Sequence, residues 1–264
     1  MSSEFLYSQS ETLIAVLLLA LLLGGAEAGY RIGRRRQSQN SESAKSRISA
    51  VQSATLALLG LLLGFTIGTS ISRYDGRKKD LVNEANAIGT AALRARLLPA
   101  PERGEAVNLI RRYVDNRLES SHRSWDPELR NELDQKASQV HEQLWLLAAA
   151  VAKKEPQNFT TGLFIQAVNE VIDSKGSRDA GLDNHVPETV LFLLFTAAVL
   201  AVGMVGYVNG IAGHRATVVT AMLSVLFGLT IFVIVDLDRP RRGLIQVSQK
   251  SMIELKNSLD KPPP

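Results

Sequence analysis

Four long apolar stretches run through the chain, over residues 13–28, 51–71, 189–208 and 217–235. Each approaches the roughly 20 residues that a helix needs to cross about 30 Å of hydrocarbon. Lipid offers no hydrogen-bonding partners, so the backbone groups of each stretch must be satisfied internally, which favours helices. The pattern predicts a multi-pass integral membrane protein.

The first apolar stretch has two readings, a cleaved signal peptide or a retained membrane helix. The small residues Ala26 and Ala28 resemble a cleavage site, but a signal peptide begins with positive charge. Here Glu4 and Glu11 precede the stretch, and the arginines follow it, in residues 31–36. We therefore expect a retained membrane helix.

The polar region between the second and third apolar stretches keeps helical periodicity. Apolar residues recur every three or four positions from Leu81 to Leu98, and neither proline nor a glycine pair interrupts them. The second membrane helix is therefore predicted to continue to Pro99.

Further helices are predicted downstream. Asp126 and Pro127 form a typical N-cap and first helical position. Another helix is expected over residues 163–172, closed by Gly176, and an amphipathic tail helix between Leu244 and Leu259.

No alternating strand pattern of useful length is present, so the predicted class is all-α: an integral membrane protein with four transmembrane helices in two hairpins and a helical extramembrane domain between them. The short links between paired apolar stretches favour the hairpins. The predicted organisation is a first transmembrane segment (1–30), a basic link (31–47), a second transmembrane segment (48–73), the extramembrane domain (74–187), a transmembrane hairpin (188–235) and a basic, amphipathic tail (236–264).

Composition removes several functional classes. The net charge of +4 arises from Lys and Arg that cluster beside apolar stretches, where they anchor helices in lipid, so we expect no nucleic-acid partner. The chain has no cysteine. No phosphate-binding loop, nucleophile elbow or dinucleotide fingerprint occurs, and we expect neither enzyme activity nor a cofactor. The histidines are scattered without metal-ligand spacing, so we expect no metal site: His122, His141, His185 and His214.

Charge does not decide the orientation. The arginine-rich first link favours the cytoplasmic side for itself, and so the opposite side for the middle domain. Basic residues at 73–79 and 239–242 favour a cytoplasmic middle domain instead.

The second apolar stretch has two unlike helical faces. Gly60, Gly64 and Gly68 follow the small-residue spacing that lets another helix approach closely. The opposite face carries hydroxyl groups and ends in an arginine, as a pore lining can. The candidate pore-lining residues are Thr55, Leu62, Thr66, Thr69, Ser70, Arg73 and, further along the same helix, Glu84 with Asn83 and Asn86.

Plainer readings of these residues stay open. Serine and threonine in membrane helices often bond to the carbonyl four residues earlier, and a terminal arginine often extends to the interface. Glu84 also fits a solvated helix face. Asp236 and Asp238, beside three arginines, are expected to form an interfacial salt-bridge cluster.

Several blocks after Ile48 carry a family resemblance. They are Leu62-Leu63-Gly64-Phe65-Thr66, Ser72-Arg73-Tyr74-Asp75, Glu84-Ala85-Asn86-Ala87-Ile88-Gly89-Thr90-Ala91, Leu97-Leu98-Pro99 and Asp236-Leu237-Asp238-Arg239-Pro240-Arg241-Arg242-Gly243. They resemble the bestrophin-like family of bacterial membrane proteins, and the third and last blocks are the most specific.

That resemblance implies distant kinship with bestrophins, which are pentameric anion channels whose second membrane helix lines the pore. It also implies that the middle domain and both termini are cytoplasmic. The second helix lacks an aromatic-rich neck segment, and no acidic calcium clasp can be matched. Anion selectivity and calcium gating therefore do not carry over.

The leading expectation is a homo-oligomeric ion channel of the inner (plasma) membrane, pentameric if it follows bestrophins, with the bilayer and inorganic ions as partners. The alternative is a membrane-anchored interaction or sensor protein without transport activity. A channel is expected to purify as a closed ring with the second helices at its axis.

Overall fold

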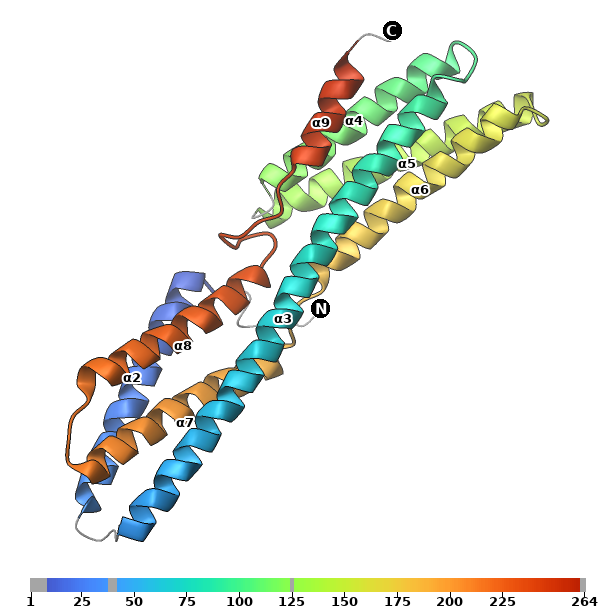
Figure 1. Ribbon diagram of the computed structural model, residues 1–264. Helices are drawn as coiled ribbons and strands as arrows, with labels where there is room; N and C mark the ends of the chain where they lie inside the picture. The colour runs from blue at the N-terminus through green and yellow to red at the C-terminus, as the bar shows by residue number, and fades with distance from the viewer. Residues whose placement is uncertain (1–8, 38–41, 124–125, 262–264) are drawn as a thin grey trace. The chain divides into compact units, whose positions relative to one another are not determined.

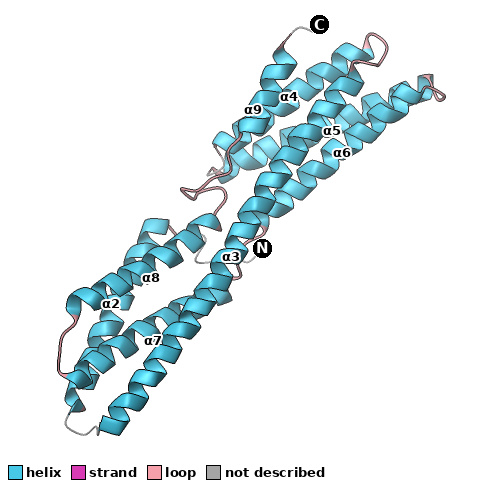
Figure 2. Ribbon diagram, viewed as in Figure 1, coloured by secondary structure: helices cyan, strands magenta, loops and turns pink. Residues whose placement is uncertain are grey.

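The computed structural model describes residues 9–37, 42–123 and 126–261 (Figure 1). Within these ranges the chain is built of helices and loops and contains no strand, which confirms the all-α prediction (Figure 2). Part of the predicted basic link and the proline-rich end lie outside the described residues. The helices are α2 (Glu11–Arg35), α3 (Glu42–Ala95), α4 (Glu102–His122), α5 (Pro127–Lys154), α6 (Phe159–Asp183), α7 (Glu188–Ala212), α8 (Thr217–Leu237) and α9 (Lys250–Asp260).

The chain divides into two compact units. The first, here called the membrane unit, comprises Met1–Ser72, His185–Arg239 and Gly243–Ile245. The second, here called the helical unit, comprises Arg73–Asn184, Pro240–Arg242 and Gln246–Pro264. The long helix α3 contributes its first part to the membrane unit and its second part to the helical unit.

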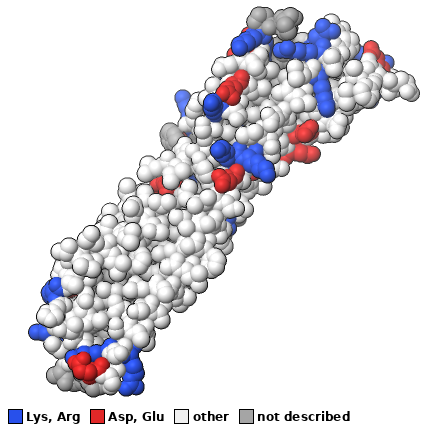
Figure 3. Space-filling model, viewed as in Figure 1, with Lys and Arg blue, Asp and Glu red and all other residues white. Residues whose placement is uncertain are grey.

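In the described part of the chain, four helices are long and apolar enough to cross a membrane: α2, α3, α7 and α8. Large apolar side chains point outward from them, among them Leu17 of α2 and Met222 of α8, which are 54% and 68% exposed. Figure 3 shows a broad band of this unit's surface without charged side chains. Such a surface is suited to lipid, and the chain is a multi-pass membrane protein.

The core of the membrane unit rests on an unusually close contact between α2 and α7. A Cβ added at Gly29 would fall on the carbonyl oxygen of Gly203, and one added at Gly206 would fall on that of Ala26. Helix backbones can touch in this way only where no side chain intervenes. Leu18 and Leu22 of the first apolar stretch are buried in the same unit.

The core of the helical unit joins α3, α4, α5, α6 and α9 through buried apolar side chains such as Ile88, Tyr113 and Phe164. The predicted cap of α5 is confirmed, since the Asp126 carboxylate accepts hydrogen bonds from the amides of residues 128 and 129. The predicted continuation of α3 through Gly89 is also confirmed, but the helix ends at Ala95 and not at Pro99.

Two further predicted helix boundaries were wrong. Helix α6 runs through Gly176 to Asp183, because packing of its buried side chains outweighs the roughly 1 kcal/mol that an internal glycine costs. The tail helix begins only at Lys250, and Leu244 is 79% exposed outside it. The apolar side chains of α9 that are buried in the core are Met252 and Leu259.

The membrane segment of α3 predicts a simple topology. Because one span separates them, Ser46, before that span, and Ser138, in α5, should lie on opposite sides of the membrane. Both are exposed, and the chain has no cysteine of its own. In intact cells, an impermeant thiol reagent should label only one of the variants Ser46→Cys and Ser138→Cys. Labelling of both from the same side would show that α3 does not span.

Candidate functional site

The membrane segment of α3 has one covered side and one open side. Leu59, Leu63 and Ser70 are 1%, 6% and 0% exposed, and the first two belong to the core of the membrane unit. Leu61 and Phe65, on the other side, are 55% and 69% exposed. The helix therefore packs against its own chain along one side only.

The hydroxyl groups of the predicted pore stripe are bonded within the helix. Thr55, Thr66 and Thr69 donate to the carbonyl oxygens of the residues four positions earlier, over 2.8, 2.7 and 2.9 Å. These threonines thus form the bonds to the helix backbone that were expected as the alternative to a pore lining. An oxygen that donates in this way can still accept from water.

The stripe does not lie on one exposed face. Thr69 is exposed, Leu62 and Arg73 are half-buried, and Ser70 is fully buried in the membrane unit. Leu62 packs against the unit's apolar core. Ser70 therefore does not face the surface of the chain, and the prediction that it lines a pore needs correction.

The predicted glycine seam lies on the open side of α3. A Cβ added at Gly60, Gly64 or Gly68 would meet no atom of the described chain within 4 Å. No described part of this chain packs on the seam at these three positions, so the predicted packing of another helix there stays a prediction. The close glycine contact inside the chain lies instead between α2 and α7.

Glu84 is the centre of a buried polar cluster in the helical unit. Its side chain is 0% exposed, although the sequence suggested a pore mouth. One carboxylate oxygen accepts from Arg117 Nε and from Tyr113 Oη, each over 2.8 Å. The other accepts from Arg178 Nη1 over 2.6 Å. Glu84 is therefore a structural anion that joins α3, α4 and α6, while Asn83 and Asn86 beside it stay exposed.

Burial and charge oppose each other at this cluster. Burial raises the pKa of Glu84, but the adjacent guanidinium groups of Arg117 and Arg178 outweigh it, so this pKa lies below its usual value. Burial, and then the charge of Glu84, raise the pKa of Tyr113 well above its usual value. Glu84 is therefore charged and Tyr113 neutral at neutral pH.

His141 packs against the same cluster, with its ring centre 4.6 Å from that of Tyr113. Burial, together with the positive charges of Lys175 and Arg117, lowers the pKa of His141 from 6.5 to about 4, against the opposing pull of Glu84 and Asp179. The folded chain therefore holds this imidazole neutral in a range where the unfolded chain protonates it.

Acid should destabilise the helical unit through His141. The unfolded chain binds the extra proton as pH falls through 6.5, so the stability that depends on neutral His141 is lost progressively down to about pH 4. The loss is roughly 3 kcal/mol at most, from about 1.4 kcal/mol per pKa unit. Between pH 7 and pH 5, the melting temperature of purified His141→Gln should fall less than that of the wild-type protein. The exposed control His122→Gln should keep the wild-type slope, and equal slopes in all three proteins would contradict this assignment.

The carboxylates of the Asp-Leu-Asp-Arg block at the end of α8 bond to backbone amides, and the predicted interfacial salt-bridge cluster stays a prediction. Asp236 is buried and accepts from the amides of Leu244 and Ile245, over 2.6 and 2.9 Å. Asp238 accepts from the amide of Val186 over 2.5 Å. These carboxylates fix the backbone of the turn and of the segment that enters α7.

Sequence reasoning missed Arg117, Arg178 and Tyr113 as partners of Glu84. A signal for its burial was present, because Glu84 stands between Leu81 and Ile88 on the apolar face of α3. The identity of the partners could not be read in this way, since α4 and α6 come together only in the folded chain. Among the described residues, no group of acidic or histidine side chains could hold a metal ion.

Several solved structures share this fold. A bacterial bestrophin homologue from Klebsiella pneumoniae is 16% identical, with a TM-score of 0.69 over 92% of this chain and 96% of that one. A variant of the homologue is 15% identical, with a TM-score of 0.67, covering 92% and 97%. A structure described only as a membrane protein is 16% identical, with a TM-score of 0.71, covering 93% and 97%.

At this level of identity, structural likeness establishes the fold alone. No curated protein matches the sequence. The model of the family described as the bestrophin-like domain, however, matches residues 19–252. Since that match covers most of the chain, including both parts of α3, the protein belongs to the bestrophin-like family.

Proposed function

We propose that this protein is a homo-oligomeric ion channel of a bacterial inner membrane, with its pore lined by α3, and that it is not an enzyme. The observation that carries the proposal is the open side of α3. It extends along the membrane segment, contains Gly60, Gly64 and Gly68, and is covered by no other helix of the described chain. Family membership supports the same function.

An open helix face of this kind is suited to a ring of identical subunits. Small residues at every fourth position let neighbouring helices approach, or leave room for an axial passage. Closed rings are the usual symmetry of membrane oligomers with a central axis, and the kinship with bestrophins favours five subunits. The pairing of α2 with α3 and of α7 with α8 as hairpins stays part of the proposal, although the close backbone contact of α2 is with α7.

The residues proposed for the pore change once the buried ones are removed. Thr69 is kept as a pore-lining candidate and Ser72 is added, because both are exposed hydroxyl residues of α3. Ser70 and Glu84 are withdrawn because they are buried. Leu61 and Phe65 lie on the open side and would form an apolar constriction, which can gate a pore by excluding water.

A membrane-anchored interaction or sensor protein is the alternative. Its support is the helical unit, which has a core of its own and exposed polar surfaces on which a partner could bind. The two functions differ in their assemblies. Images of detergent-solubilised particles should show a closed ring with α3 at the axis for a channel, and neither a ring nor an axial hole for the alternative.

Gly64→Leu tests the role of the open side. The substitution adds a bulky side chain where the single chain has free space, so the subunit should still fold. In a ring the same side chain should disturb the contact at or near the axis, at a cost of about 1–3 kcal/mol from overpacking. Size-exclusion chromatography should show partial loss of the oligomer. An oligomer of unchanged size and thermal stability would contradict a packed or axial position for this face.

A further inference from the structure

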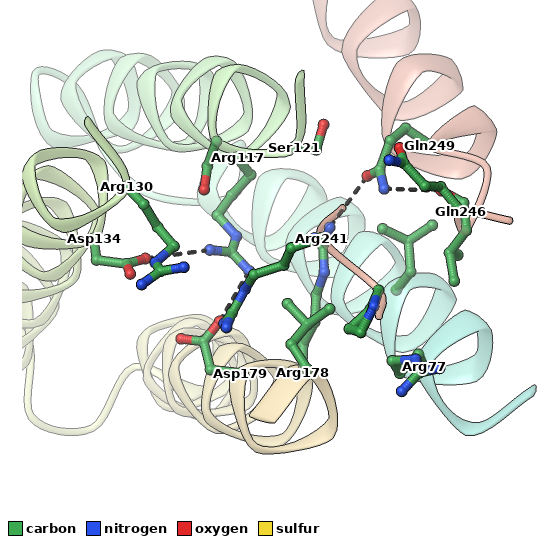
Figure 4. Close-up of a pocket in the computed structure, with 15 residues that line it drawn as sticks. Arg77, Arg117, Ser121, Arg130, Asp134, Arg178, Asp179, Arg241, Gln246 and Gln249 are labelled. Carbon is green, nitrogen blue, oxygen red and sulfur yellow. Dashed lines mark hydrogen bonds and ion pairs between the residues drawn. The ribbon is translucent and has the colours of Figure 1, made fainter. Parts of the chain in front are cut away.

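A cavity of about 70 Å³ in the helical unit lies against the Glu84 cluster. Five arginines line it, together with only two acidic residues, Asp134 and Asp179. Figure 4 shows that the arginines come from separate segments of the chain: Arg77 from α3, Arg117 from α4, Arg130 from α5, Arg178 from α6 and Arg241 from the segment after α8.

The carboxylates around the cavity leave an excess of positive charge. Glu84 forms ion pairs with both Arg117 and Arg178. Asp179 forms an ion pair with Lys175 over 2.5 Å and a longer one with Arg117 over 3.4 Å. Among the described residues, no ion pair joins the guanidinium of Arg130 to an acid. Arg241 pairs with Asp183 over 2.8 Å. With Glu84 and Asp183 added to the two lining aspartates, four carboxylates face five guanidinium groups and the ammonium group of Lys175.

The arginines in the wall are also removed from bulk water. Arg77, Arg117 and Arg178 are 4%, 4% and 7% exposed. Charges in such a place interact more strongly than at the surface, because the local dielectric is lower. Their planar N–H groups match the oxygens of an oxyanion, which they bind by paired hydrogen bonds.

We propose that this cavity binds a small tetrahedral oxyanion, of which free inorganic phosphate is the simplest example. A water needs about 10–15 Å³ of such space, so the cavity holds a group of a few oxygens and not a nucleotide, whose sites occupy hundreds of Å³. Bound anion would link α3, α4, α5 and α6 to residues 240–242 and 246–249 of the helical unit. The inference does not depend on ion conduction.

The test is titration calorimetry on the full-length protein in detergent, at constant ionic strength in chloride. Phosphate and sulfate should each bind saturably, with one site per chain, and phosphate should raise the melting temperature. Acetate, which is planar, and glycerol 3-phosphate, which carries a bulky ester, should bind at least tenfold more weakly. Acetate or the ester binding as tightly as phosphate would overturn the assignment to a small free tetrahedral ion.

Two variants avoid the arginines that hold Glu84. Arg130→Gln and Arg241→Gln should each weaken phosphate binding about tenfold, as expected for one charge-assisted hydrogen bond. Their melting temperatures without phosphate should stay close to wild type. Arg112→Gln, which removes an exposed arginine of α4 outside the cavity, is the matched control and should bind normally. Absence of saturable phosphate binding, or equal affinities in all three variants, would overturn the proposal.

Discussion

Glu84→Ala should cost about 3–5 kcal/mol of the stability of the helical unit, because it leaves two buried guanidinium groups without their shared anion. Arg117 and Arg178 are themselves buried and cannot turn to water without opening the contacts between α3, α4 and α6. The Tyr113 hydroxyl would lose its acceptor in the same step. We expect low yield and a strongly lowered melting temperature in detergent.

Two comparisons isolate this effect. Glu142→Ala removes an exposed acid of α5 and should change the melting temperature little. Glu84→Gln keeps the shape and the acceptor oxygen but removes the charge, so it should fall between wild type and Glu84→Ala. A stable Glu84→Ala protein would mean that the cluster is not required for the fold. It would also contradict the burial of Glu84 between Arg117 and Arg178.

Gly206→Ala should separate α2 from α7. The added methyl group would fall on the carbonyl of Ala26, and backbone atoms cannot move aside as a flexible side chain can. Overpacking of this kind typically costs about 1–3 kcal/mol, and the rigid contact favours the upper end of that range. The subunit itself should lose thermal stability, in contrast to Gly64→Leu, whose effect should appear in the oligomer.

Gly24→Ala is the matched control for this contact. It adds the same methyl group to α2, at a position with no atom within 4 Å. Alanine is also the better helix former, so this variant should be neutral or slightly more stable. Equal melting temperatures for Gly24→Ala and Gly206→Ala would show that α2 and α7 do not touch through their backbones.

The spans, the helical class and the continuation of α3 could be predicted from the sequence because each depends on local pattern. Apolar length determines whether a segment can cross lipid, and the cap at Asp126 needs only neighbouring residues. The family resemblance was carried by short blocks in the same way, and the family match confirms it.

Which side of α3 is buried and which is exposed could not be predicted, because that depends on which other helices cover it. The pattern predicted a glycine side and a hydroxyl side, but it could not show that Ser70 and Glu84 point into the chain. It also gave no reason to prefer the glycines of α3 over those of α2 and α7 for close packing. The arginine cavity was missed for the same reason, since its arginines are distant in sequence and meet only in the fold.

Ion flux through liposomes containing single-cysteine variants tests the channel most directly. Thr69→Cys and Ser72→Cys place a thiol on exposed positions of α3, and Ser70→Cys places one on a buried position; all three are small changes in a chain without native cysteine. In sodium, potassium or chloride gradients, purified wild-type protein should conduct, and a charged thiol reagent should not affect it. The reagent should change flux through the first two variants and leave Ser70→Cys unaffected. Absence of flux with every ion, voltage and pH, or flux that the reagent changes in none of the α3 variants, would contradict a pore lined by α3.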